Sequence, residues 1–82
     1  MNNYFVQKNI KLSFEFDQYA SKNPRVWNKI PNGSLVIFTI KGDDEFNTWS
    51  GYSAGKVKSK NQKVIQAIKE HKTWRVLNYN PA

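Results

Sequence analysis

The sequence has no cysteine, only two arginines and a single acidic residue after residue 45. The absence of cysteine excludes disulfides, cysteine-ligated zinc, iron–sulfur clusters and thiol catalysis. No apolar run approaches the roughly 18 residues of a membrane-spanning helix. The polar opening Met1–Tyr4 also lacks the apolar stretch of a signal peptide. We therefore expect a soluble cytoplasmic protein that has no membrane partner.

The chain is long enough for one hydrophobic core and too short for two, since it has 82 residues. Hydrophobic residues make up 39% of it and aromatic residues 15%, which is typical of a folded chain and not of a disordered one. Large rings suit a small domain, which buries only about 60–65% of its unfolded surface. We expect residues 1–82 to form a single domain.

Positive charge is concentrated in the C-terminal half. The net charge is +7, and residues 46–82 carry seven basic residues and one acidic residue, against six and five in residues 1–45. Such an asymmetry favours a polyanionic partner, nucleic acid first and an acidic protein second. Eleven lysines and ten asparagines are also what an A/T-rich genome would encode by codon bias alone. A basic face without a function therefore remains an alternative.

The N-terminal segment allows two interpretations. Alternation of apolar and polar residues over Ile10–Phe16 is typical of a strand, whereas Phe5, Leu12, Phe16 and Ala20 would share one face of a helix. Twenty residues without glycine or proline favour the helix. The pattern therefore predicts a helix over residues 3–22.

Turn residues divide the middle of the chain. Asn23–Pro24 predicts a short helical turn over residues 25–30. The continuously apolar and β-branched run Leu35–Ile40 predicts a central strand buried on both faces. Asp43 or Asp44 can then cap a second helix over residues 44–56, in which Gly51 and Gly55 each cost about 1 kcal/mol relative to alanine. Close contact with another element, or an early end of the helix, would explain these glycines.

Two structures are compatible with the last third of the chain. Residues 62–72 contain mostly good helix formers, so a third helix is one alternative. The other is a hairpin with strands 64–69 and 73–79, although its turn lacks glycine and asparagine. The β-like run Trp74–Tyr79 favours the hairpin.

Three segments of the chain together resemble a family of small prokaryotic proteins of unknown function. They read KNIKLSFEFDQY at residues 8–19, KIPNGSLVIF at 29–38 and DDEFN at 43–47. The resemblance covers roughly residues 8–50 and implies a helix, a turn, a hydrophobic strand, an acidic cap and a second helix. It also implies a later strand or hairpin over residues 64–79, but no catalytic motif. The chain departs from the family pattern after Ser50, where Gly51 and Gly55 replace helix formers.

The elements combine into a small two-layer α/β (α+β) domain of order helix–strand–helix–strand–strand. Strands 35–41, 64–69 and 73–79 would form one sheet, covered by helices 3–22 and 44–56. A sheet of three strands leaves free edges, so a homodimer is also compatible with the pattern.

Three patterns resemble functional sites but have simpler explanations. Gly51 to Lys56 lacks the spacing of a phosphate-binding loop, which needs four residues between its glycines. Acidic residues 43–45 lack the alternating ligands of a calcium loop and fit a helix cap. His71 is the only histidine and has no evident catalytic partner. We therefore expect no enzyme activity, no metal site and no cofactor.

The remaining candidates are cations and an aromatic residue in the C-terminal half. Exposed aromatic residues flanked by cations bind single-stranded nucleic acid by stacking, although Trp74 would also serve as a core residue. The first hypothesis is a nucleic-acid-binding protein; the alternative is a module that binds a protein partner, as in toxin–antitoxin-like or other two-gene pairs, through a sheet edge or an aromatic patch. The predicted nucleic-acid-binding residues are Lys56, Lys58, Lys60, Lys63, Lys72, Trp74 and Arg75. The first four, which precede the second strand, are called the basic rim below.

Overall fold

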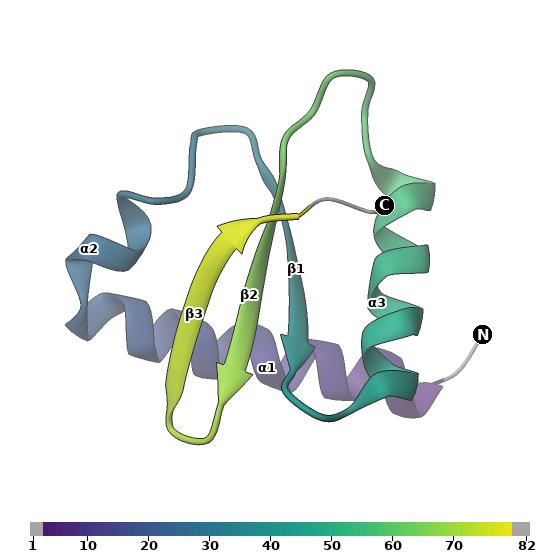
Figure 1. The fold of residues 1–82 in the computed structure, drawn as a ribbon, viewed down its shortest axis with the longest axis horizontal. Coiled ribbons are helices and arrows are strands. Elements are labelled where there is room, and N and C mark those ends of the chain that lie inside the picture. Colours follow the sequence, from purple (N-terminus) through teal and green to yellow (C-terminus); the bar gives the residue numbers. More distant parts are fainter. Residues whose placement is uncertain (1–2, 80–82) are drawn as a thin grey trace.

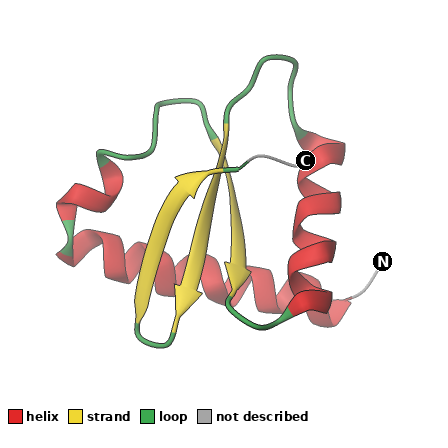
Figure 2. Ribbon diagram, in the orientation of Figure 1, coloured by secondary structure: helices red, strands yellow, loops and turns green. Residues whose placement is uncertain are grey.

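The computed structural model describes residues 3–79, which form three helices and three strands (Figures 1 and 2). The elements are α1 (Asn3–Lys22), α2 (Pro24–Trp27), β1 (Leu35–Ile40), α3 (Asp44–Val57), β2 (Val64–Glu70) and β3 (Thr73–Asn78). The predicted α+β class and the order helix–strand–helix–strand–strand are confirmed. The ends of the two long helices and of the three strands agree with the prediction within one residue. The alternative of a third helix over residues 62–72 is wrong.

α1 is a helix because its buried residues recur every four positions. Leu12, Phe16 and Ala20 are buried, whereas Ile10 and Phe14 are 43% and 65% exposed. A strand would have placed Ile10, Leu12, Phe14 and Phe16 on one face. The buried residues are those with helical spacing and not those that alternate, so the structure confirms the helix.

The sheet has the order β1-β2-β3, with β1 parallel and β3 antiparallel to β2 (Figure 1). The prediction that β1 is the central strand is therefore wrong, because β2 lies in the middle. β1 is nevertheless shielded on both faces. Ile37 and Thr39 are buried on one face, and Phe38 packs toward Phe16 of α1 on the other. A continuous apolar run predicts that both faces of a strand are buried, but it does not predict whether the strand is central or at the edge of the sheet.

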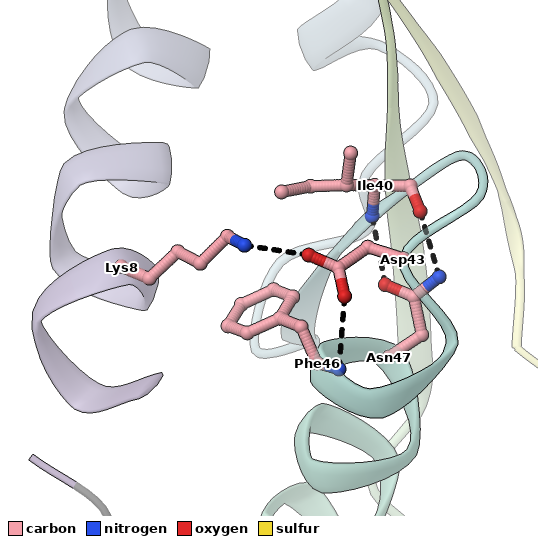
Figure 3. A network of polar contacts seen from close by, with 5 residues as sticks. All are labelled: Lys8, Ile40, Asp43, Phe46 and Asn47. Carbon is pink, nitrogen blue, oxygen red and sulfur yellow. Dashed lines mark hydrogen bonds and ion pairs between the residues drawn. The ribbon is translucent and has the colours of Figure 1, made fainter. Parts of the chain in front are cut away.

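The free edge of β1 is closed at one point by a side chain of α3. Asn47 accepts a hydrogen bond from the backbone N–H of Ile40 at 2.8 Å and donates one to the carbonyl of the same residue at 2.7 Å (Figure 3). The amide thus replaces one residue of a neighbouring strand. This bond pair also fixes α3 to the end of β1.

The core lies between α1 and the sheet face that it crosses. Phe16 and Ala20 of α1 and Ala67 of β2 are its buried centre. Trp74 and Phe38 complete it, with ring centroids 5.2 and 5.6 Å from that of Phe16. One helix face and three strands therefore share a single apolar cluster.

The hairpin between β2 and β3 forms without glycine or asparagine in its two-residue turn. His71 adopts a positive φ of 59°, a region that histidine enters more readily than most residues. The Thr73 hydroxyl donates to the carbonyl of Glu70 at 3.0 Å and closes the turn. These two features replace the expected turn residues.

The two glycines of α3 have different causes, which substitution to alanine can separate. A Cβ at Gly51 would lie 2.5 Å from the hydroxyl oxygen of Tyr79, whereas a Cβ at Gly55 would have nothing within 4 Å. We expect Gly55→Ala to raise the free energy of unfolding by about 1 kcal/mol, through helix propensity. Gly51→Ala should raise the free energy of unfolding by less, because the Tyr79 side chain must move to make room for the new methyl group. Thermal unfolding measures both changes in stability. In a chain that also carries Tyr79→Phe, which removes the hydroxyl group, Gly51→Ala should stabilise the protein as much as Gly55→Ala does.

Equal stabilisation by Gly51→Ala and Gly55→Ala in the otherwise unchanged chain would contradict the close contact of Gly51 with Tyr79. No positive φ restricts either position, so the contact alone distinguishes them.

Candidate nucleic-acid interface

The basic rim begins at the C-terminal end of α3, beside an exposed tyrosine. Lys56 places its Nζ atom 4.4 Å from the ring centroid of Tyr52, one helical turn earlier. The Tyr52 side chain is 67% exposed. An aromatic ring and a cation therefore lie together on the surface, at the point where α3 leads into the connection to β2.

The connection over residues 58–63 is held in a defined shape by one glutamine. Gln62 accepts a hydrogen bond from the backbone N–H of Ser59 at 2.9 Å and donates one to the carbonyl of Gly33 at 2.9 Å. Asn61 takes a positive φ of 64°, which asparagine tolerates well. The backbone N–H of Leu35 donates to the carbonyl of Lys63, which continues the pairing of β1 with β2. The lysines therefore project from an anchored turn.

All four lysines of the basic rim are exposed, and no acidic residue occurs between residues 46 and 69. Ion pairs among residues 3–79 are formed instead by cations elsewhere in the fold. Lys8 pairs with Asp43, Lys69 with Glu15, and both Lys41 and Arg75 with Glu70. Within residues 3–79, the positive charge of the rim is thus not neutralised by an ion pair.

The predicted site is only partly brought together by the fold. Lys72 lies in the β2–β3 turn, at the end of β2 opposite the rim (Figure 1). Arg75 is on β3, and its Nε atom lies 3.0 Å from a carboxylate oxygen of Glu70. Trp74 is half-buried, with its ring in edge contact with Phe16 and Phe38. The rim and these three residues therefore occupy separate places.

Tyr52 was not among the residues predicted from the sequence, but its exposed ring adjoins Lys56 of the rim. The signal was present, because Tyr52 and Lys56 are four residues apart in a predicted helix and must lie on one face. The side-chain bridge from Gln62 to Gly33 had no such signal. It joins residues 29 positions apart and depends on the parallel pairing of β1 with β2.

An ion pair stabilises the opposite end of α3, where Asp43 is the N-cap (Figure 3). Asp43 accepts a hydrogen bond from the backbone N–H of Phe46 at 3.3 Å and one from Lys8 at 2.5 Å. The hydrogen bond with Lys8 lowers the pKa of Asp43 from its ordinary 3.8, and the same bond raises the pKa of Lys8 from its ordinary 10.5.

Stability from the Lys8–Asp43 pair should depend on pH at both extremes. The contribution of Asp43 is present above its ordinary pKa and is lost as the pH falls through the lowered value. That of Lys8 is present below its ordinary pKa and is lost as the pH rises through the raised value. Asn also caps helices, so Asp43→Asn keeps the cap but removes the charge. We expect this variant to lose less stability than the wild-type chain between pH 7 and pH 2 in urea unfolding.

If Asp43→Asn and the wild-type chain lost the same stability between pH 7 and pH 2, the ion pair would contribute nothing in solution. Asp44→Asn is the matched control, since this exposed neighbour in the first turn of α3 has no ion pair within residues 3–79.

The three patterns set aside from the sequence have ordinary structural positions. Gly51 and Gly55 lie within α3 and not in a loop, and His71 is exposed in a turn. Among residues 3–79, no group of three or more His, Cys, Asp or Glu side chains is placed to hold a metal ion. No helix in that range is both long and apolar enough to cross a membrane.

The fold and this surface define a small α+β domain whose basic rim forms no ion pair with the other described residues. A model of a family of unknown function, DUF5647, matches residues 4–78. The chain therefore belongs to this family, which confirms the resemblance to a domain of unknown function and extends it from residues 8–50 to most of the chain. No curated protein and no solved structure matches the chain.

Proposed function

We propose that this protein is a small cytoplasmic, prokaryotic nucleic-acid-binding protein that contacts phosphates through the basic rim. The observation that carries the proposal is the clustering, in one segment, of exposed lysines that form no ion pair within residues 3–79. Lys8, Lys41, Lys69 and Arg75 have carboxylate partners, whereas the rim has four exposed lysines within eight residues and no acidic neighbour in sequence. Release of counterions from phosphates is the main source of affinity for such a surface.

The chemistry of the rim supports binding without strong sequence preference. Lysine is a flexible point charge that suits phosphate, whereas base recognition in the major groove relies mostly on the two-pronged guanidinium of arginine. The rim contains no arginine, and Arg75 is engaged with Glu70. Contacts of this kind position a nucleic acid and give little sequence information.

Salt dependence tests the proposal directly. The full chain is titrated into labelled 12-mer oligonucleotides, and fluorescence anisotropy is measured between 50 and 200 mM salt. If all four rim lysines contact phosphates of a single strand, log K should fall with log salt with a slope of roughly −3. Absence of binding at the lowest salt, or affinity that does not change with salt, would refute the proposal.

A protein partner is the second candidate, and the free edge of β3 favours it. β3 pairs with β2 on one side only, and the structure places no strand of residues 3–79 on its other side. An unpaired edge can add a strand from another chain, either an acidic protein partner or a second copy. A clean monomeric protein that ignores oligonucleotides at low salt would direct the search to a protein partner; a dimer by light scattering would favour the second copy.

A further inference from the structure

A hollow of about 290 Å³ lies next to the basic rim. One side is α3, where Gly51 and Gly55 contribute no side chain. Val64 of β2 and Tyr79 line it as well, and Lys58 and Gln62 lie at its polar border. The hollow thus combines an apolar lining with one of the rim cations.

The position of Tyr79 is fixed by backbone pairing and by close contact with α3. The backbone N–H of Tyr79 donates to the carbonyl of Val64 at 3.0 Å, which continues the pairing of β3 with β2. Its hydroxyl oxygen lies 2.5 Å from the position that a Cβ at residue 51 would take. The glycine is therefore what allows an aromatic residue from the end of β3 to reach α3 and border the hollow.

Tyr52 extends this surface around the helix. At 100° per residue, Gly55 lies between Gly51 on one side and the pair Tyr52 and Lys56 on the other. Tyr52 therefore lies about 60° around the helix from Gly55, so the exposed ring adjoins the Gly55 side of the hollow, and Lys56 lies beyond the ring, about 100° from Gly55. A cation over a solvent-exposed ring is held only weakly, so Lys56 can leave the ring for a phosphate.

We propose that the ligand is a single strand, of which one unpaired base enters the hollow and a neighbouring base stacks on Tyr52. This inference rests on the proposed function, since the rim lysines hold the phosphates. Base faces are apolar and flat, and in a duplex they are hidden by stacking, so a hollow beside phosphate contacts accepts only an unpaired base. Lys56 exchanges its place over the Tyr52 ring for a phosphate as the base arrives.

Base identity should matter little at this site. Hydrogen bonds with Ser59 and Gly33 hold the Gln62 amide in one orientation and leave it at most one further N–H and one oxygen lone pair for a base edge. Lys58 offers only a cation on a flexible stem. Stacking without hydrogen-bond recognition is tolerant of sequence. The four homopolymers should therefore bind with affinities that differ by only a few-fold.

The test compares a labelled 12-mer of thymidylate, a 12-mer of uridylate and a 12-base-pair duplex, with the full chain at constant salt. We expect each single strand to bind at least about tenfold more tightly than the duplex. Tyr52→Ala should weaken single-strand binding on the order of tenfold and leave duplex binding unchanged. Gly55→Leu, which fills the hollow, should have the same selective effect.

Matched control variants distinguish a loss of affinity specific to Tyr52 and the hollow from the effect of a similar substitution elsewhere on the surface. Tyr4 is 66% exposed and has Lys8 5.5 Å from its ring centroid, so Tyr4→Ala removes a similar ring–cation pair from α1. Thr48→Leu places the same leucine side chain at an exposed position of α3 outside the hollow. Neither control should change single-strand affinity, and thermal unfolding verifies that every variant folds.

Photocrosslinking gives a readout that does not depend on variants. A single strand that carries 5-iodouracil should crosslink to Tyr52 or Tyr79, as mapped by mass spectrometry. Equal affinity for duplex and single strand, or crosslinks confined to other residues, would overturn the single-strand inference and leave the proposed function standing. Failure of every oligonucleotide to bind at low salt would refute both.

Discussion

Phe16→Ala should unfold a large fraction of the protein, because Phe16 is the ring around which the core is built. Its side chain is 2% exposed and its ring contacts those of Trp27, Phe38 and Trp74, with centroids 5.2–5.9 Å apart. Removal of a buried phenylalanine costs about 3–5 kcal/mol. A domain of this size has a total stability near the lower end of 5–15 kcal/mol. Urea unfolding followed by tryptophan fluorescence measures the loss.

Phe14→Ala is the matched control for this prediction. Phe14 is the same residue type in the same helix, two positions earlier, but it is 65% exposed. We expect its replacement to change the free energy of unfolding by no more than about 0.5 kcal/mol. Similar losses for the two variants would mean that α1 does not present the helical face described here.

Replacement of two rim lysines should weaken nucleic-acid binding far more than the loss of two charges elsewhere. We expect the pair Lys58→Ala and Lys60→Ala to lower affinity on the order of tenfold at 100 mM salt. The slope of log K against log salt should become less steep by roughly 1.4, which corresponds to two phosphate contacts on a single strand. Anisotropy titrations over a salt series give both quantities.

The control for the lysine prediction removes the same charge from α1. Lys11 and Lys22 are exposed, and neither forms an ion pair within residues 3–79. Lys11→Ala with Lys22→Ala should change affinity by no more than about twofold and leave the slope unaltered. Equal effects of the two double variants would show that net charge, and not the rim, determines binding.

Local patterns predicted the helices and strands because the apolar residues of each element recur with the spacing of a helix or of a strand. The run Leu12, Phe16 and Ala20 identified the inner face of α1, and Asp43 was one of the two caps expected for α3. The hairpin formed against its turn composition, because His71 tolerates a positive φ and Thr73 supplies a hydrogen bond. Local chemistry was sufficient wherever the partners were close in sequence.

The position of β1 in the sheet could not be read from its residues. α1 packs on one face of the sheet and α3 lies against β1, so an edge strand carries the apolar run expected of a central one. Its free edge is closed at Ile40 by a side chain seven residues away, which has no signature in a single sequence. Strand order depends on such packing and hydrogen bonding between elements.

Only part of the candidate site could be predicted, because the sequence does not show on which face of the fold each side chain lies. The rim lysines follow one another along the chain and stay together, whereas Lys72, Trp74 and Arg75 are close in sequence but diverge. Alternation along β3 turns Trp74 toward the core and Arg75 to the opposite face, and the turn carries Lys72 to the far end of the sheet. Charge counting locates a basic segment but not the face on which each side chain lies.

The most direct test of the central claim is an NMR titration of the ¹⁵N-labelled chain with a 12-mer of thymidylate at low salt. The account predicts amide shift changes concentrated in Tyr52–Lys63, extending to Val64 and Tyr79 at the hollow, and reversed by added salt. Changes concentrated in the β2–β3 turn around Lys72, or no changes at all at low salt, would contradict the assignment of nucleic-acid binding to the basic rim.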